Sequence, residues 1–269
     1  MKPAFLFLAL LICLSPALSQ TPAVPPAQGP ASAAPAFPAD PSAGPASAGA
    51  AVNQGLTALQ GNQPQAALAD FQQALQADPQ NATAAQLAAT AALELYQASL
   101  AVQYAEKAHQ LDPQSWKIHT TLVAAYAAAG HRQQRDQERA LLRQMHATGA
   151  PDARQATEFL LEIFPSGQNR MDAVEYFEPV GKFHTYYRFL VRQPDGRRIW
   201  EIDVQSNDFD EKSWAQAHPA QAASGQRQFQ LTGHGDNGKE TDYRMFSGQP
   251  DYDAIRAMVV QILQSYSPQ

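Results

Sequence analysis

Apolar positions follow a helical spacing in the first half of this 269-residue chain and an alternating spacing in the second half. From residue 51 to about 147, apolar side chains recur every three or four positions, which is typical of amphipathic helices. From about residue 170 onward, Tyr187, Phe189 and Val191 alternate with polar residues, the period of a half-buried strand. The pattern therefore predicts an α+β protein with helical hairpins first and an antiparallel sheet after them.

The domain at 170–269 is expected to contain about five strands covered by a C-terminal helix. The strands expected are 174–177, 183–192, 200–204, 228–231 and 241–246. The last two flank Asp236-Asn237-Gly238, and Asn-Gly tolerates the positive φ angles of a tight hairpin turn. From Pro250 onward, Ile255, Val259 and Ile262 share one helical face, which predicts the covering helix.

Residues 152–165 are expected to form a helix that connects the two halves. Phe159, Leu160, Ile163 and Phe164 fall on one helical face, and Pro165 follows them. Because proline cannot donate to the helix ladder, we place the end of this helix there.

A motif recurs at an interval of 34 residues in the region 51–147. Asp78-Pro79 is followed by Asp112-Pro113, and matching alanines precede both pairs. A fixed period of this length indicates stacked helical hairpins, an α-solenoid of about three units. The residues that define the register are Gly55, Ala67, Phe71, Ala74 and Pro79 in the first unit, Ala101, Ala108 and Pro113 in the second, and Tyr126 and Gly130 in the third.

On these residues, the region resembles the tetratricopeptide repeat family. The second unit departs from the family at Ala105, where Phe71 has its counterpart, and the neighbouring Tyr104 can supply the missing bulk. The resemblance implies a concave face, lined by the first helix of each hairpin, that binds a protein or peptide partner. The residues expected on that face are Asn53, Leu56, Gln86, Thr90, Thr120 and Ala124. The alternative is that the protein's own C-terminal half fills this groove.

The N-terminus has the features of a secretory signal peptide, expected at 1–19 with cleavage after Ser19. One lysine precedes a short apolar run that ends with small residues. Cys13, the only cysteine, lies inside this segment; lipidation there is the alternative. Residues 20–50 are almost entirely Pro, Ala, Ser and Gly and are expected to be a disordered linker. We therefore expect an exported protein, periplasmic or secreted and of bacterial type, without disulfides or a membrane span after cleavage.

The charge pattern argues against nucleic-acid binding. The formal net charge is −6, and no basic run concentrates positive charge on one face. The nearest approach to a basic stripe is interleaved with Asp136 and Glu138, which favours a solvated helix face. Its members are Arg132, Arg135, Arg139 and Arg143.

No recognisable catalytic motif, metal-ligand spacing or phosphate-binding glycine loop appears, so no enzyme activity and no cofactor are expected. The densest polar cluster surrounds the second hairpin turn and has two interpretations, a cation site or a soluble sheet edge. It consists of His234, Asp236, Glu240 and Asp242. His184 can be a general base or a packing residue. Trp200 is expected in the core, and the placement of Trp214 is open.

The leading hypothesis is a non-catalytic exported protein whose repeats bind a protein partner, with an α+β domain of unknown ligand. The first alternative is an enzyme or small-ligand binder in residues 170–269 with the repeats as an accessory scaffold. The second is a structural envelope component that associates with itself through its helices.

Overall fold

The computed structural model describes residues 45–181, 184–206, 228–235, 240–247 and 251–265, together with residues 216 and 219. All of them belong to one unit of the chain, Ala33–Gln269. The predicted signal peptide at 1–19 and the linker up to residue 44 lie outside the described residues.

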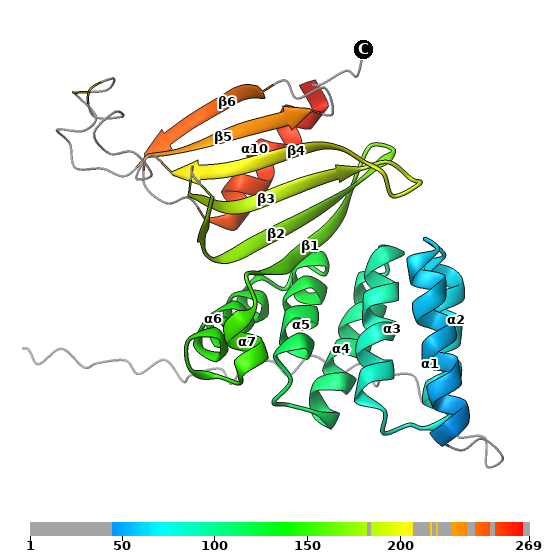
Figure 1. Ribbon diagram of the computed structural model, residues 1–269. Coiled ribbons are helices and arrows are strands. Elements are labelled where there is room, and N and C mark those ends of the chain that lie inside the picture. The colour runs from blue at the N-terminus through cyan, green and yellow to red at the C-terminus, as the bar shows by residue number, and fades with distance from the viewer. Residues whose placement is uncertain are drawn as a thin grey trace, which may run out of the picture. The chain divides into compact units, whose positions relative to one another are not determined.

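Six helices form three consecutive hairpins, and a short seventh helix follows them (Figure 1). Their bounds are α1 Pro45–Gln60, α2 Pro64–Ala77, α3 Ala82–Glu94, α4 Ala98–Leu111, α5 Trp116–Ala128, α6 Arg132–Thr148 and α7 Pro151–Gln155. Helix α1 therefore begins inside the segment predicted as linker. Ala48 in its first turns is buried, so packing supports a helix that composition alone did not indicate.

The turn inside each hairpin has the same backbone geometry at intervals of 34 residues. Asn62, Tyr96 and Gly130 all have left-handed φ angles, of 55°, 57° and 72°. In each turn, the next residue donates its N–H to the carbonyl five positions earlier. This hydrogen bond is that of the Schellman helix end. The recurrence in three turns confirms a helical repeat in register.

The connections between hairpins also repeat, although less completely. The carboxylates of Asp78 and Asp112 each accept the backbone N–H two residues later, at 3.1 and 3.3 Å. Asn81 then caps α3, accepting the N–H of Ala84 at 2.9 Å, as expected of a cap residue. Ser115 occupies the equivalent position before α5 but makes no side-chain cap hydrogen bond.

The helices pack through small residues in close contact. A Cβ atom added to Gly55 would lie 2.5 Å from the Phe71 ring, so glycine at this position lets the ring reach α1. Phe71, Ala74, Ala101 and Ala108 have no exposed surface. Tyr104 is also fully buried, as the loss of bulk at the next position led us to expect.

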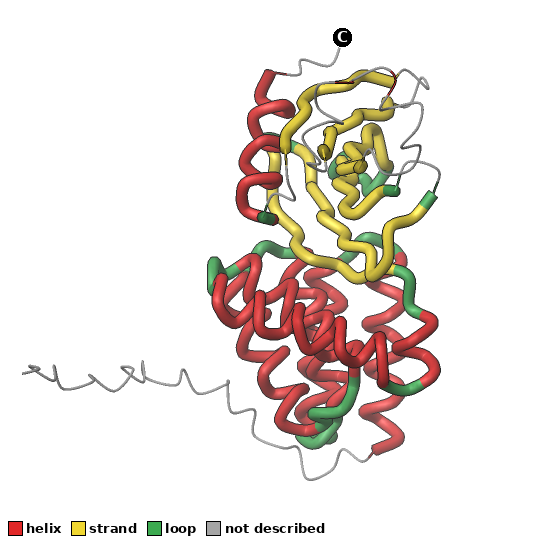
Figure 2. Tube along the Cα trace, turned by 90° about the vertical axis from the view of Figure 1, so that its left-hand side faces the viewer, coloured by secondary structure: helices red, strands yellow, loops and turns green. Residues whose placement is uncertain are grey.

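The second half is one antiparallel sheet whose six strands lie in chain order, β1-β2-β3-β4-β5-β6. The strands are β1 Glu158–Ser166, β2 Asn169–Val180, β3 Thr185–Arg192, β4 Arg198–Ser206, β5 Gln228–Gly235 and β6 Glu240–Ser247. Helix α10, Tyr252–Ser265, runs along one face of the sheet (Figure 2). Its buried residues Ile255, Val259 and Ile262 share a core with Phe189 and Ile202.

The prediction of a helix at 152–165 was wrong beyond its first turn. Helix α7 ends at Gln155, and residues 158–166 form β1, which pairs with β2 along its length. Phe159 and Phe164 belong to the sheet core, whereas Ile163 belongs to the core of the helices. A short apolar run with both faces covered carries no period that separates helix from strand.

The two cores meet at β1. Ile163 of β1 packs among the helices, and Val123 of α5 and Leu142 of α6 pack into the sheet core. Each core therefore contains residues from the other half. A fragment cut at about residue 147 would expose part of both.

Candidate functional site

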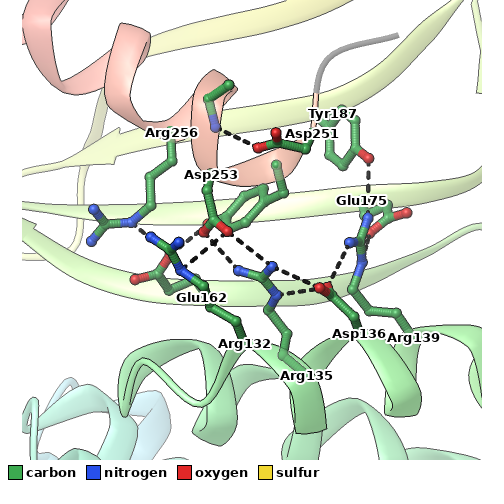
Figure 3. Close-up of polar contacts among 12 residues, drawn as sticks. Arg132, Arg135, Asp136, Arg139, Glu162, Glu175, Tyr187, Asp251, Asp253 and Arg256 are labelled. Carbon is green, nitrogen blue, oxygen red and sulfur yellow. Dashed lines mark hydrogen bonds and ion pairs between the residues drawn. The ribbon is translucent and has the colours of Figure 1, made fainter. Parts of the chain in front are cut away.

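The arginines of α6 contact the sheet and α10. Arg135 is only 5% exposed, and it donates from Nη1 to Asp253 at 2.8 Å and from Nε to Asp136 at 2.9 Å (Figure 3). Burial opposes the charge of Arg135, but these hydrogen bonds outweigh it and raise the pKa of the guanidinium above its ordinary value. The hydrogen bond from Arg135 is also the main reason that the pKa of Asp253 lies below its ordinary value.

Two further arginines of α6 hold a buried carboxylate of β2. Glu175 is 1% exposed and accepts from Arg139 Nε at 2.8 Å, and it also pairs with Arg143. Arg139 donates in addition to the hydroxyl of Tyr187 at 3.1 Å. The expectation of a solvated helix face was therefore wrong for Arg135 and Arg139, whereas Arg132 and Arg143 are exposed. Arginines at helical spacing fit either a solvated face or a charged interface, and Glu175 is too distant in sequence to decide between them.

A second buried carboxylate, that of Glu162, joins β1 to α10. Glu162 accepts from the hydroxyl of Tyr252 at 2.6 Å and from Arg256 Nε at 2.8 Å. The guanidinium carbon of Arg256 lies 4.1 Å from the centre of the Phe164 ring. Burial, followed by the charge of Glu162, raises the pKa of the Tyr252 phenol well above its ordinary value. We call these contacts among α6, α10, β1 and β2 the arginine junction.

A hollow of about 240 Å³ opens beside the arginine junction. The turn between α5 and α6 forms one wall, and charged side chains of α6, β1 and α10 form the rest. We call it the arginine hollow, and its charged residues are Arg132, Arg135, Glu162, Asp253 and Arg256. Sequence reasoning missed it, because its residues come from three distant segments.

The residues predicted for the concave face of the repeats divide into three groups. Asn53 and Leu56 on α1 are exposed, Leu56 to 37%. Gln86, Thr90 and Thr120 are half-buried. Ala124 is fully buried in the helical core, so its assignment to the groove was wrong. The surface that these positions offer is therefore concentrated on α1.

The half-buried groove residues make contacts within the repeats. Gln86 of α3 donates to the Lys117 carbonyl of α5 at 3.2 Å and lies 3.3 Å from the Thr121 hydroxyl. Thr90 and Thr120 donate to carbonyls of their own helices, at 3.2 and 2.7 Å. Gln86 therefore links two hairpins, whereas the hydroxyls of Thr90 and Thr120 bond within their own helices.

A second hollow, of about 590 Å³, lies against α1 and α2. It is lined by small and uncharged polar residues and by one carboxylate, that of Asp70, and it includes Asn53 and Thr57.

The polar cluster predicted around the second hairpin turn is described only in part. Strand pairing aligns His234 with Glu240 across β5 and β6 and aligns Asp242 with Thr232, whereas Asp236 lies outside the described residues. The imidazole Nε2 of His234 lies 3.8 Å from Asp203 Oδ2. Among the described residues, no group of three His, Cys, Asp or Glu side chains is placed to hold a metal ion.

Sequence reasoning missed the ionic partners that extend this sheet face. Asp203, 3% exposed, accepts from Arg188 Nε at 2.8 Å. Asp172 on β2 is held by Arg170 and Arg192, at 2.5 and 2.7 Å. Burial alternates along β3, which puts Arg188 and Arg192 on one face, and the strand register decides which carboxylates they meet. We call this set the polar sheet face.

The remaining sequence candidates are distributed as follows. Trp200 is 5% exposed in the sheet core, which confirms its core assignment. His184 ends the β2–β3 turn with a φ of 47°, and its carbonyl accepts the N–H of Ser206. Trp214 lies outside the described residues. In the described part of the chain, no helix is long and apolar enough to cross a bilayer.

Comparison with known proteins assigns no family to this chain. Neither the models of known protein families nor the curated proteins contain a match to the chain.

Proposed function

We propose that this chain is a non-catalytic exported protein whose tetratricopeptide-like repeats bind a protein or peptide partner. The observation that carries the proposal is the exposed surface of α1. Leu56 is one of three large apolar side chains exposed among the described residues, and Asn53, one turn before it, lines the hollow against α1 and α2. An exposed apolar side chain beside uncharged polar groups suits an extended or helical peptide.

The proposed partner surface is restricted to the start of the repeats. β1 packs on α5, and Glu94 at the end of α3 pairs with Arg170 of the sheet. The sheet therefore packs against part of the later hairpins. Export and the linker remain part of the proposal, based on the sequence features of residues 1–44.

The test uses the full-length chain, because the two halves share core residues. A photo-crosslinking amino acid at Asn53 should trap a discrete partner in extracts of exported proteins. The same amino acid at Gln73, exposed on α2, is the matched control. Substitution Leu56→Asp should abolish binding of the trapped partner, whereas Gln73→Asp should leave it unchanged. Equal trapping at both positions would contradict the proposal.

The second candidate function is a small-ligand site on the polar sheet face. The observation that favours it is His234, which lies near Asp203 with 35% of its side chain exposed. A ligand of this kind should perturb the NMR resonances of His234 and Arg188 and leave those of α1 unmoved. Perturbation confined to α1 would reject this candidate.

A further inference from the structure

The arginine hollow has an excess of one positive charge. Three guanidinium groups and two carboxylates line it, so the formal sum is 3 − 2 = +1. The two carboxylates are already bound. Asp253 accepts from Arg135 Nη1 and Nη2 at 2.8 and 3.2 Å, and Glu162 Oε2 accepts from Tyr252 and Arg256. Asp136, which lies outside this lining, also accepts from Arg135.

Two of the three arginines keep donors that these contacts do not use. Arg135 engages Nε, Nη1 and Nη2 with Asp136 and Asp253. Arg256 uses Nε for Glu162, and Arg132 approaches Asp253 through Nε at 3.3 Å with 72% of its side chain exposed. Among the described residues, no hydrogen bond engages the Nη groups of Arg132 and Arg256, and both residues line the hollow.

The guanidinium of Arg256 is held in a fixed orientation. Glu162 binds its Nε, and the Phe164 ring lies against it at 4.1 Å. A guanidinium fixed at one edge presents its remaining N–H groups as a fork, which matches the two oxygens of a carboxylate. Arg132 and Arg256 approach the same small volume from α6 and α10 (Figure 3).

The backbone at the mouth of the hollow also favours an anion. Helix α6 begins at Arg132, and its N-cap residue His131 makes no side-chain cap hydrogen bond. The positive end of a 17-residue helix is therefore not neutralised by a cap at this position.

From these observations we infer that the arginine hollow binds a carboxylate group. A carboxylate places one negative charge in the hollow, whereas a phosphate dianion would place two beside Glu162 and Asp253. The volume of about 240 Å³ admits a small acid or one acidic group of a larger ligand. The carboxylate comes either from a small free acid or from an acidic side chain or chain end of a protein.

The experiment titrates the full-length protein with succinate, inorganic phosphate and two short peptides at constant ionic strength. One peptide ends in two glutamates, and the other is its amidated glutamine counterpart. Binding is followed by calorimetry and by the NMR Nε–Hε resonances of the arginines. Saturable binding of succinate or the glutamate peptide, with shifts at Arg132 and Arg256, is expected. Tighter binding of succinate indicates a small free acid as the source of the carboxylate, and tighter binding of the glutamate peptide indicates a protein.

Variants separate this site from general charge attraction. Arg132→Gln, at an exposed position, should weaken binding about tenfold, as for loss of one charge-assisted hydrogen bond. Arg154→Gln removes an exposed arginine from α7 and should leave affinity unchanged. Arg256→Lys keeps the charge but loses the fork, and it should weaken the carboxylate more than phosphate. Equal effects of Arg132→Gln and Arg154→Gln, phosphate binding as tight as carboxylate, or no saturable binding would each overturn the inference.

Discussion

The helical hairpins pack on one another through apolar side chains, whereas α6 contacts the sheet mainly through ion pairs. Between the hairpins, the contact is made by small and aromatic residues without exposed surface, such as Ala74, Ala108 and Phe71. Between α6 and the sheet, buried carboxylates are held by arginines, as Glu175 is by Arg139. The stability of the first interface depends on how well side chains fill the space between helices. The stability of the second depends on each buried charge keeping its partner of opposite sign.

This difference has consequences for how each interface responds to change. Apolar packing does not depend on the ionisation of its side chains, but it loses stability steeply when a cavity opens. A buried charge that loses its partner is strongly destabilising, although replacing the whole pair by apolar groups can be neutral. The two interfaces can therefore be distinguished by single and double substitutions.

The largest effect is expected in the repeats. Phe71→Ala removes a fully buried ring that packs against Gly55 of α1, and it should lower the free energy of unfolding by about 3–5 kcal/mol. Urea denaturation followed by circular dichroism measures the change. A loss below about 1 kcal/mol would mean that the hairpins do not depend on this contact.

The next effect tests the arginine junction. Glu175→Gln leaves Arg139 and Arg143 without their carboxylate and should cost about 3 kcal/mol. The double variant Arg139→Met with Glu175→Met should recover most of this loss, because it removes both buried charges of that pair. Equilibrium unfolding of the unmodified protein and of these two variants measures the loss and the recovery of stability. Failure of the double variant to recover stability would show that Glu175 acts through packing.

A smaller effect tests the repeated turns. Tyr96 adopts a left-handed φ that costs a non-glycine residue about 1 kcal/mol, so Tyr96→Gly should be neutral or stabilising, whereas Gly130→Ala should lose about that amount. Thermal unfolding measures both changes in stability. A gain or no change in Tyr96→Gly together with a loss in Gly130→Ala would confirm that the two turns have equivalent backbone geometry. A loss in Tyr96→Gly as large as that in Gly130→Ala would contradict it.

The smallest effect is a pH dependence within the helices. Burial alone would lower the pKa of His119, but its contact with Glu138 at 2.6 Å and further acceptors raise the pKa above the ordinary 6.5. The stabilisation is therefore fully present below pH 6.5 and is lost as the pH rises through the folded-state value. The free energy of unfolding should fall as the pH rises from 6.5 through the folded-state pKa of His119. In the His119→Gln variant, this fall should be smaller. A stability that rises through this window in the unmodified protein would contradict the assignment.

Local signals were sufficient for most elements of the fold. The interval of 34 residues predicted the hairpins, because the residues that define it lie close together in the chain. Alternation predicted five strands, and the sixth, β1, was taken for a helix because Phe159 to Phe164 fit both periods. The candidate sites fared less well. Ala124 was placed in the groove from its repeat position, whereas it is buried among the helices.

The sequence by itself determined the repeat register, the order of helices before strands, and the covering helix α10, because each of these depends on residues close together in the chain. Tertiary structure alone decided which charged residues meet. Arg135 and Asp253 are separated by 118 positions, and Arg139 reaches Glu175 only once α6 rests on the sheet. Pairing across such distances is set by the packing of finished elements, which no local pattern records.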